Sequence, residues 1–149
     1  MNKLIIYDSQ FGNTEKIARA IAESISAKAL KIGELGTVDI KGLDVLVVGS
    51  PTQGGRPTAS LQQFLENISA GELKNVQVAA FDTRFSESDS PFPLNLIIKT
   101  FGFAAPKIAK IIERAGGKPI ANPEGFIVKG KDGPLVSGEI ERAKKWIRL

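Results

Sequence analysis

Short apolar stretches alternate with amphipathic helical patterns along the whole chain, and this alternation is the strongest constraint on the fold. Residues 3–7 (KLIIY) and residues 44–49 (DVLVVG) both have the composition of buried strands. Between them, apolar residues recur at Ile17, Ile21 and Ile25, the spacing of one helix face. Such alternation predicts an α/β fold in which helices cover both faces of a parallel sheet.

The order of the expected elements defines the topology. We expect strands over residues 3–7, 29–32, 44–49, 76–81 and 118–128, and helices over 15–27, 58–68, 94–115 and 137–146. Right-handed crossovers between five strands favour a three-layer, doubly wound sheet with strand order 2-1-3-4-5. The 149 residues suit a single domain over 1–149.

Four local features refine these elements. Thr14 or Asn13 is a candidate N-cap for the first helix, and Ser137 for the last. Gly102 and Pro106 interrupt the 94–115 pattern, which predicts two helices or a kink. The fifth strand is broken by Asn122-Pro123 but contains no long insertion.

The absence of both cysteine and histidine limits the possible chemistry. It excludes disulfides, thiolate metal sites and the commonest general base. No carboxylate cluster has the spacing of an oxygen-ligated metal site. We therefore assign no catalytic residue and no metal site.

Charge and hydropathy indicate the cellular compartment of the protein and the kinds of partner that it could bind. The N-terminus lacks the features of a signal peptide and no apolar run is long enough to span a membrane, so we expect a cytoplasmic protein. The last third of the chain is basic and the remainder slightly acidic. This basic region is either a solvated helix face or a surface for an acidic partner or a nucleotide phosphate; no nucleic-acid motif is present.

A ligand site is expected beyond the carboxyl ends of the strands, where the direction of winding switches. For this strand order, the loops over residues 9–14 and 50–57 flank the switch point, and the loop over 82–93 lies beside them. These three loops are also the least core-like parts of the first two thirds of the chain. They are expected to form one site.

The first loop, SQFGNT, combines hydroxyl, amide and glycine residues at the start of a helix. Unpaired N–H groups there attract anions, so the loop is either a phosphate site or a simple capped turn. It contains no lysine or arginine, so a phosphate would be held without an ion pair. The triphosphatase pattern G-x-x-x-x-G-K-[ST] and the dinucleotide pattern G-x-G-x-x-G are both absent. A phospho-acceptor receiver domain is excluded because Gly49-Ser50 stands where its aspartate is needed.

SQFGNT resembles the phosphate loop of flavodoxins, written roughly [ST]-x-[TSF]-G-x-T, which binds the 5′-phosphate of flavin mononucleotide (FMN). SPTQGGRPTASLQQFL is similar to the loop of that family that covers one side of the flavin ring, and FDTRF lies where the family covers the other side. The fifth strand has no long insertion, and in this it resembles the short-chain type. The resemblance implies FMN as cofactor, bound by Ser9, Gln10, Phe11, Gly12, Asn13, Thr14, Ser50, Pro51, Thr52, Gln53, Gly54, Gly55, Asp82, Thr83, Arg84 and Phe85.

Individual residues of these loops allow more than one interpretation. The peptide at Gly54-Gly55 either faces flavin N5 and flips on reduction or simply forms a tight turn. Phe85 either stacks on the ring or enters the core, and Phe11 either anchors its loop or forms part of the wall. Trp146 and Tyr7 lie outside the ring-covering loops, unlike the tryptophan and tyrosine that sandwich the ring in many flavodoxins.

Two arginines also depart from the acidic pattern of flavodoxins. Arg56 and Arg84 lie in the two loops expected to flank the ring. A cation there would stabilise the anionic reduced flavin and make the potential of the last electron less negative. Alternatively, both side chains point to solvent.

The function implied is that of a low-potential electron carrier that works with unidentified redox partner proteins. An FMN-dependent reductase of quinones with NAD(P)H is the first alternative, and a flavin-free interaction domain is the second.

The apolar stretch over residues 91–106 either packs in the core or forms a surface for a partner or a dimer. We therefore expect a monomer or a weak homodimer.

Overall fold

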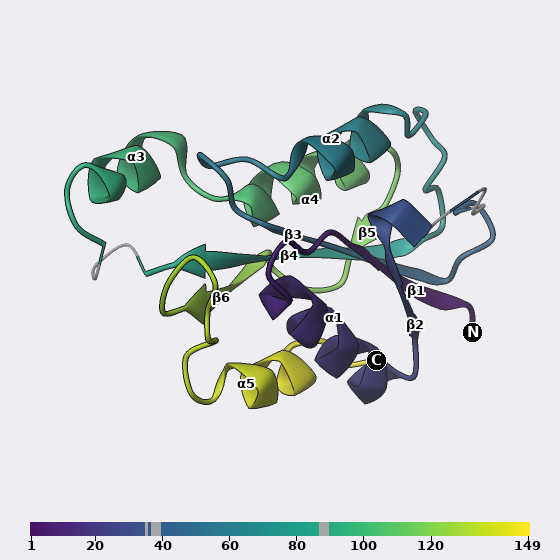
Figure 1. The fold of residues 1–149 in the computed structure, drawn as a ribbon. Coiled ribbons are helices and arrows are strands. Elements are labelled where there is room, and N and C mark those ends of the chain that lie inside the picture. Colours follow the sequence, from purple (N-terminus) through teal and green to yellow (C-terminus); the bar gives the residue numbers. More distant parts are fainter. Residues whose placement is uncertain (35, 37–39, 87–89) are drawn as a thin grey trace.

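The computed structural model describes residues 1–34, 36, 40–86 and 90–149, and its centre is a parallel sheet (Figure 1). The sheet has the order β2-β1-β3-β4-β5, and β6 pairs with the end of β4. This confirms the predicted α/β class and the order 2-1-3-4-5, because β5 and β6 are the two halves of the fifth predicted strand. The elements are β1 (Lys3–Tyr7), α1 (Asn13–Ile25), β2 (Lys28–Lys31), the 3₁₀ turn η1 (Ile32–Glu34), β3 (Val45–Pro51), α2 (Ala59–Glu66), β4 (Gln77–Phe85), α3 (Leu94–Phe101), α4 (Ala104–Arg114), β5 (Lys118–Pro119), β6 (Glu124–Val128) and α5 (Glu139–Trp146).

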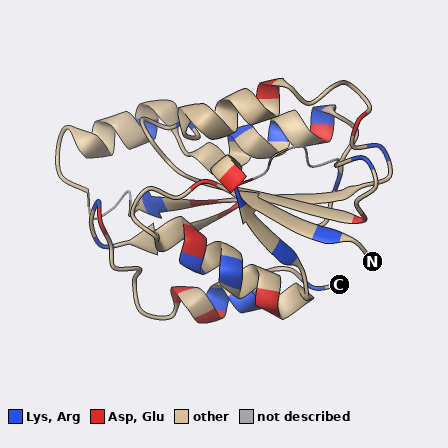
Figure 2. Cartoon of the chain, turned by 45° about the vertical axis from the view of Figure 1, so that its right-hand side comes forward, with Lys and Arg blue, Asp and Glu red and all other residues tan. Residues whose placement is uncertain are grey.

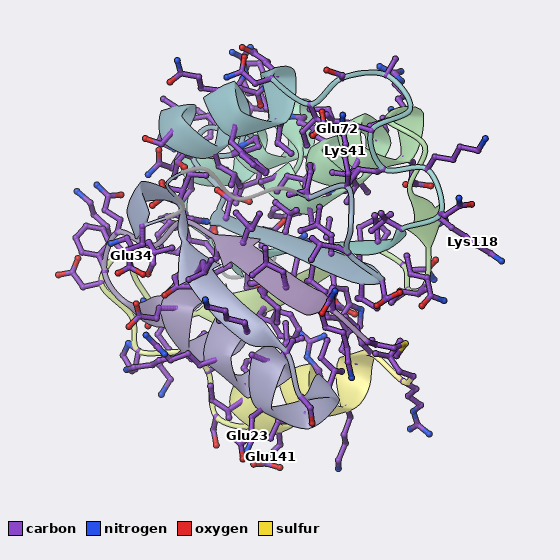
Figure 3. The ribbon with its side chains drawn as sticks, turned by 90° about the vertical axis from the view of Figure 1, so that its right-hand side faces the viewer. Glu23, Glu34, Lys41, Glu72, Lys118 and Glu141 are labelled. Atoms are coloured by element: carbon purple, nitrogen blue, oxygen red, sulfur yellow. The ribbon has the colours of Figure 1, made fainter. Side chains whose placement is uncertain are left out.

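Helices cover both faces of the sheet and create two apolar cores (Figure 1). On one face, α1 and α5 bury Ile17 and Ile21 against Phe81 of β4. On the other, α2 and α4 bury Leu61 and Ile108 against β3 and β4. Charged side chains such as those of Glu23 and Glu141 lie on the outside of the α1/α5 layer (Figure 3). The strands are apolar on both faces because each face meets a helix layer.

The strands that lead to the expected site are longer than predicted. β3 continues to Pro51 and β4 to Phe85, with Ser50 paired to Asp82 and Pro51 to Thr83. The prediction of a loop from residue 82 was therefore wrong for residues 82–85. Residues 82–85 remain in the sheet because β6 pairs with all of them and β3 also pairs with Asp82 and Thr83. Residues 87–89 of the predicted loop lie outside the described part of the chain.

The helix starts also differ from the sequence expectations. Gly12 occupies the N-cap position of α1 with φ 94°, and Gly138 that of α5 with φ 92°, so capping by Asn13, Thr14 or Ser137 was wrong. A left-handed φ is accessible to glycine at little cost, which explains why both helices follow a glycine. The predicted break in 94–115 is confirmed at Gly102 and Phe103. Pro106 instead lies in the first turn of α4, where a missing N–H removes no intrahelical bond.

None of the helices in the described part of the chain is both long enough and apolar enough to cross a bilayer.

Candidate functional site

A cavity of about 330 Å³ opens beyond the carboxyl ends of β1, β3 and β4, at the switch point of the sheet. Its walls come from the three predicted segments and from α3. The predicted site residues that line it are Gln10, Phe11, Asn13, Thr14, Pro51, Thr52, Gln53, Gly54, Gly55, Thr83, Arg84 and Phe85. The structure therefore brings together segments that are up to 75 residues apart in the sequence, as the strand order predicted.

The other four predicted residues lie behind the wall rather than in it, and three of them organise the segments. Ser9 Oγ accepts hydrogen bonds from the N–H groups of Gly12 and Glu15, at 3.1 and 3.3 Å. Ser50 Oγ accepts from the Thr58 N–H at 3.0 Å and donates to the Pro51 carbonyl. Asp82 is fully buried beside Arg84. Gly12, the fourth, provides the positive φ at the start of α1.

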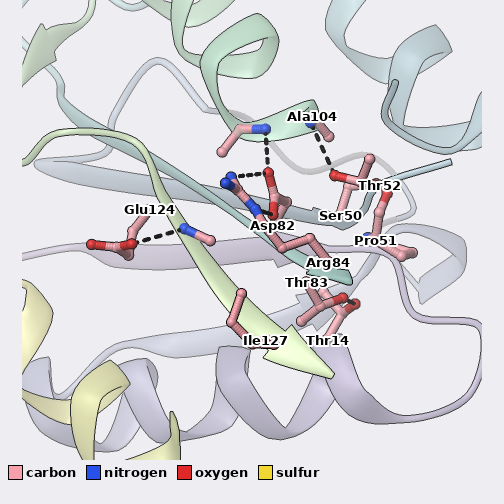
Figure 4. Close-up of polar contacts among 12 residues, drawn as sticks. Thr14, Ser50, Pro51, Thr52, Asp82, Thr83, Arg84, Ala104, Glu124 and Ile127 are labelled. Carbon is pink, nitrogen blue, oxygen red and sulfur yellow. Dashed lines mark hydrogen bonds and ion pairs between the residues drawn. The ribbon is translucent and has the colours of Figure 1, made fainter. Parts of the chain in front are cut away.

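The first loop ends in a buried hydroxyl pair at the edge of the cavity. The Oγ1 atoms of Thr14 and Thr83 lie 2.8 Å apart and share a hydrogen bond (Figure 4). The first N–H groups of α1, at Asn13 and Thr14, precede the first intrahelical bond, in which the Gly12 carbonyl accepts from the Lys16 N–H. This corner of the cavity therefore presents hydroxyl and N–H groups with the partial positive charge of a helix N-terminus.

The second loop is a tight turn packed against α3. Gln53 and Arg56 exchange two backbone hydrogen bonds of 2.8 and 3.0 Å, and Gly54 and Gly55 have φ of 57° and 81°. A Cβ atom on Gly55 would lie 2.6 Å from Phe101 Cβ, so only glycine fits there. Lys107 donates to the carbonyls of both Gly55 and Phe101, which joins the loop to the end of α3.

A buried ion pair forms the floor beneath the cavity. Arg84 donates from Nε and Nη2 to the two oxygens of Asp82, at 2.6 and 2.7 Å, and the Ala105 N–H adds a third bond (Figure 4). The guanidinium also lies 3.6 Å from the centre of the Phe103 ring. Burial raises the pKa of the Asp82 carboxyl, while Arg84 and the Ala105 amide oppose that rise. Arg84 is thus held within the protein, whereas Arg56 is exposed and does not line the cavity.

The aromatic residues fall into two groups. Phe11, 46% exposed, and the half-buried Phe85 both line the cavity, so neither is buried in the core. Tyr7 is buried in β1, and its hydroxyl donates to Glu15 Oε1 at 2.8 Å; burial together with this carboxylate raises the pKa of Tyr7 to about 12. Trp146 packs edge-on against the Phe81 and Phe126 rings, 6.1 and 6.0 Å between centroids. Neither Trp146 nor Tyr7 lines the cavity.

The segment over residues 91–106 does not pack in the core as a whole. In α3 only Ile98 is buried, while Leu96 and Phe101 are 53% and 52% exposed; Phe92, just before the helix, is 77% exposed. α3 lies apart from the other helices, beyond the end of β4, and its one charged residue is Lys99 (Figures 1 and 2). The interpretation as core packing holds only for α4, whose buried face joins the α2/α4 core.

Sequence reasoning missed one wall of the cavity. This wall consists of apolar side chains and one lysine: Leu94, Ile97, Ile98, Phe103, Val128 and Lys131. Val128 and Lys131 come from the end of β6 and the turn after it, which reach the cavity because β6 pairs with the last residues of β4. The apolar stretch over 91–106 was a signal for part of this wall, but nothing local marks Lys131.

Comparisons with known proteins agree with this geometry. The sequence profile described as "Flavodoxin domain" matches residues 4–118. A protein named Flavodoxin from Aquifex aeolicus is 31% identical over 91 residues, which cover 54% of this chain and 48% of that protein. The chain therefore matches about half the length of this relative.

Solved structures show the same fold. Oxidised Flavodoxin 1 from Bacillus cereus has a TM-score of 0.77 at 18% identity, with 97% of this chain and 93% of that chain covered. The flavodoxin of Streptococcus pneumoniae TIGR4 has a TM-score of 0.70 at 17% identity, with 97% and 94% covered. The WrbA-like flavodoxin of Agrobacterium tumefaciens has a TM-score of 0.68 at 17% identity, with 96% and 90% covered.

The profile covers most of the chain, and its match begins in β1 and ends in β5. It includes all three segments predicted to hold the ligand. The chain belongs to the flavodoxin family, whose members are FMN-binding electron carriers.

Proposed function

We propose that this chain binds FMN in the cavity at the switch point and carries electrons between redox partner proteins at low potential. The observation that carries the proposal is the division of the cavity into a polar corner and an apolar wall. The α1 N-terminus and the Thr14–Thr83 pair form the polar corner, and α3 forms the apolar wall. A flavin nucleotide has the same division between phosphate and ring.

The polar corner suits a phosphate monoester. Asn13 and Thr14 offer backbone N–H groups, an amide and a hydroxyl, and the helix N-terminus favours negative charge. Ser9 Oγ accepts two backbone N–H bonds and keeps its own hydrogen free to donate. On this proposal, Ser9 and Gly12 shape the loop, while Asn13 and Thr14 contact the phosphate.

The apolar end suits the flavin ring. Leu94, Ile97 and Ile98 of α3 line this end of the cavity together with the turn at Gly54-Gly55, which packs against the end of α3. Burying charge in apolar surroundings is costly, so this wall disfavours the anion formed on full reduction and keeps the potential low. FMN supplies the redox chemistry when bound, and these residues set its environment.

The paired state of Arg84 bears on the potential. A free positive charge of Arg84 beside the ring would stabilise the anionic reduced flavin and make its potential less negative, which is one of the two alternatives that the sequence leaves open. The ion pair of Arg84 with Asp82 leaves that pair without net charge. A pair without net charge does not stabilise the anionic reduced flavin, so it is consistent with an electron carrier of low potential.

The carrier function is favoured over a reductase of quinones because α3 occupies the side on which an open ring face would receive a substrate. The chain also contains no histidine for acid–base work. Purified holoprotein alone should not oxidise NAD(P)H with a quinone; sustained turnover would favour the reductase.

The proposal also covers the partners, the oligomeric state and the location of the protein. The exposed apolar residues around α3 suit docking of a redox partner protein close to the flavin, or weak pairing with a second copy. We infer a monomer or a weak homodimer on this basis. A cytoplasmic location goes with the proposal, because flavodoxins generally act there.

An absorption spectrum of the purified protein, before and after addition of FMN, tests the proposal directly. Bound flavin should give a yellow protein with shifted visible bands and quenched flavin fluorescence at a one-to-one ratio. A protein that stays colourless and leaves FMN fluorescence unchanged would instead be an interaction domain that retains only the fold.

A further inference from the structure

The turn after β6 lies against the first loop. It is closed by hydrogen bonds from the Lys129 N–H to the Pro134 carbonyl and from the Gly133 N–H to the Gly130 carbonyl, 2.9 and 3.0 Å. Gly133 lies so close to Asn13 that a Cβ atom on it would come within 2.6 Å of Asn13 Oδ1. The turn therefore packs directly on the first residue of α1.

Lys131 projects from this turn toward the same loop. Its Nζ atom lies 5.7 Å from the centre of the Phe11 ring, and its side chain lines the cavity together with Asn13 and Thr14. The turn after β6 contacts the first loop at two places, Gly133 against Asn13 and Lys131 against Phe11. Both places belong to the polar end of the cavity, not to the end formed by Gly54-Gly55. The ammonium group is thus placed at the end of the cavity where the helix N-terminus points.

The ammonium of Lys131 is not held in an ion pair. Among the described residues no carboxylate pairs with it, whereas Arg84 is paired with Asp82; Asp132, the next residue of the turn, is exposed to solvent and does not pair with Lys131 either. Asp8 accepts from the Ser9 N–H and the Thr58 hydroxyl. Glu15 accepts from Tyr7 and pairs with Arg19. The two acidic groups nearest in sequence to the first loop are therefore engaged elsewhere.

We propose that Lys131 provides the cation for the phosphate of the bound flavin nucleotide and so favours FMN over unphosphorylated flavin. This inference rests on the proposed function. The first loop itself contains no basic residue, so it offers the phosphate only uncharged hydroxyl and N–H donors, and the turn after β6 adds a positive charge from a different element. The Phe11 ring supports the ammonium through a cation–π contact.

The exposure of Lys131 determines how large the effect is. Its ammonium is hydrated, so the attraction is partly screened, as for other exposed ion pairs. We expect Lys131→Gln to weaken FMN binding by roughly two- to fivefold near neutral pH. The loss should be larger at low ionic strength, because added salt screens the attraction between the ammonium and the phosphate and shortens its range.

The test measures dissociation constants for FMN and for riboflavin by quenching of flavin fluorescence, at about 0.01 M and about 0.15 M salt. Lys131→Gln should lose affinity for FMN, retain its affinity for riboflavin and show a weaker salt dependence. Lys131→Arg, which keeps the charge, should retain most of the FMN affinity. Lys129→Gln is the matched control, since Lys129 lies in the same exposed turn but does not line the cavity.

Three results would overturn the inference. An equal loss for FMN and riboflavin would mean that Lys131 acts only by holding Phe11 in place. An FMN affinity and salt dependence that match the wild type in Lys131→Gln would mean that the charge does not reach the phosphate. A wild-type protein that binds neither flavin would remove the proposed function itself. Where riboflavin binds too weakly to measure, a salt dependence that flattens in Lys131→Gln but not in Lys129→Gln supports the inference.

Discussion

Thr14 and Thr83 are 69 residues apart in the sequence, and their hydroxyl oxygens share a hydrogen bond of 2.8 Å. Both residues are buried, and both line the cavity. The bond connects the first turn of α1 to the end of β4, so it fixes the polar corner relative to the floor of the cavity. Each hydroxyl can donate one bond and accept two, so the pair keeps capacity for a ligand.

Replacing Thr83 with valine should remove this connection. Thr14 Oγ1 would lose its partner, so we expect a loss of about 1 kcal/mol in the free energy of unfolding and weaker FMN binding. Urea unfolding and fluorescence titration measure the two effects. Thr100→Val is a suitable control, because its exposed hydroxyl bonds only to the Leu96 carbonyl within α3. Equal effects of the two substitutions would show that the Thr14–Thr83 bond has no special role.

The two glycines of the second loop should respond differently to alanine. Both have positive φ, which costs an alanine about 1 kcal/mol. An added Cβ meets nothing within 4 Å at Gly54, but lies 2.6 Å from Phe101 Cβ and 2.8 Å from the Phe101 carbonyl at Gly55. Gly55→Ala should therefore displace α3 and destabilise the protein by at least about 2 kcal/mol more than Gly54→Ala. Thermal unfolding of both variants tests this, and equal stabilities would contradict the contact.

The order of the elements was predictable because it depends on local apolar periodicity. The stripe at Ile17, Ile21 and Ile25 and the apolar run of β3 each identify an element without reference to the rest of the chain. The switch point then follows from topology, and so do the segments that meet there. The end of β4 was not predictable in this way, because Asp82 and Arg84 are polar residues that remain in a strand only through pairing with β3 and β6.

The composition of the cavity wall was less predictable than its position. Lys131 reaches the site through the pairing of β6 with β4, and this tertiary contact leaves no local signal. Ser9 matched the phosphate-loop pattern, yet its oxygen is already bonded to two backbone N–H groups. A motif therefore identifies the loop, whereas the role of each side chain depends on the packing around it.

The Asp82–Arg84 pair should be stabilising only as a pair. Arg84→Met would leave the Asp82 carboxylate buried without its cation, at a cost of about 3–5 kcal/mol. Burial already raises the pKa of Asp82, and loss of Arg84 would raise it further. A carboxyl whose pKa is higher in the folded protein than in the unfolded chain destabilises the fold less when it is protonated than when it is ionised. The variant should therefore lose stability as the pH rises above about 4.

The double variant Asp82→Asn with Arg84→Met is the control for that pH dependence. It has no buried carboxyl, so it should recover part of the stability at neutral pH and show no such decrease between pH 4 and 7. Urea unfolding across this pH range provides the measurement. A single variant that is equally stable at acidic and neutral pH would contradict the prediction that Arg84 lowers the cost of burying the Asp82 carboxylate.

Glu139 should contribute stability with the opposite pH dependence. Burial raises the pKa of this carboxyl, but hydrogen bonds from Arg142 and from the Ile127 N–H outweigh it, so its pKa lies below its usual value of 4.5. A depressed pKa gives stability that is present above pH 4.5 and is lost as the pH falls below it. Glu139→Gln should therefore cost about 1–3 kcal/mol at pH 7 and little at acidic pH. Glu141→Gln, exposed on the same helix, should show neither effect.

The exposed residues around α3 should cause weak self-association. Phe92, Leu96 and Phe101 expose much of their apolar surface, but three side chains form a small patch compared with the roughly 1,200–2,000 Å² of a stable interface. Light scattering should therefore show an average mass that rises slowly with concentration. Phe92→Ser combined with Leu96→Ser should abolish the rise and leave FMN affinity unchanged, whereas Asn95→Ser, a polar change on the same helix, should not affect it. A strict monomer at high concentration would assign this surface to partner docking alone.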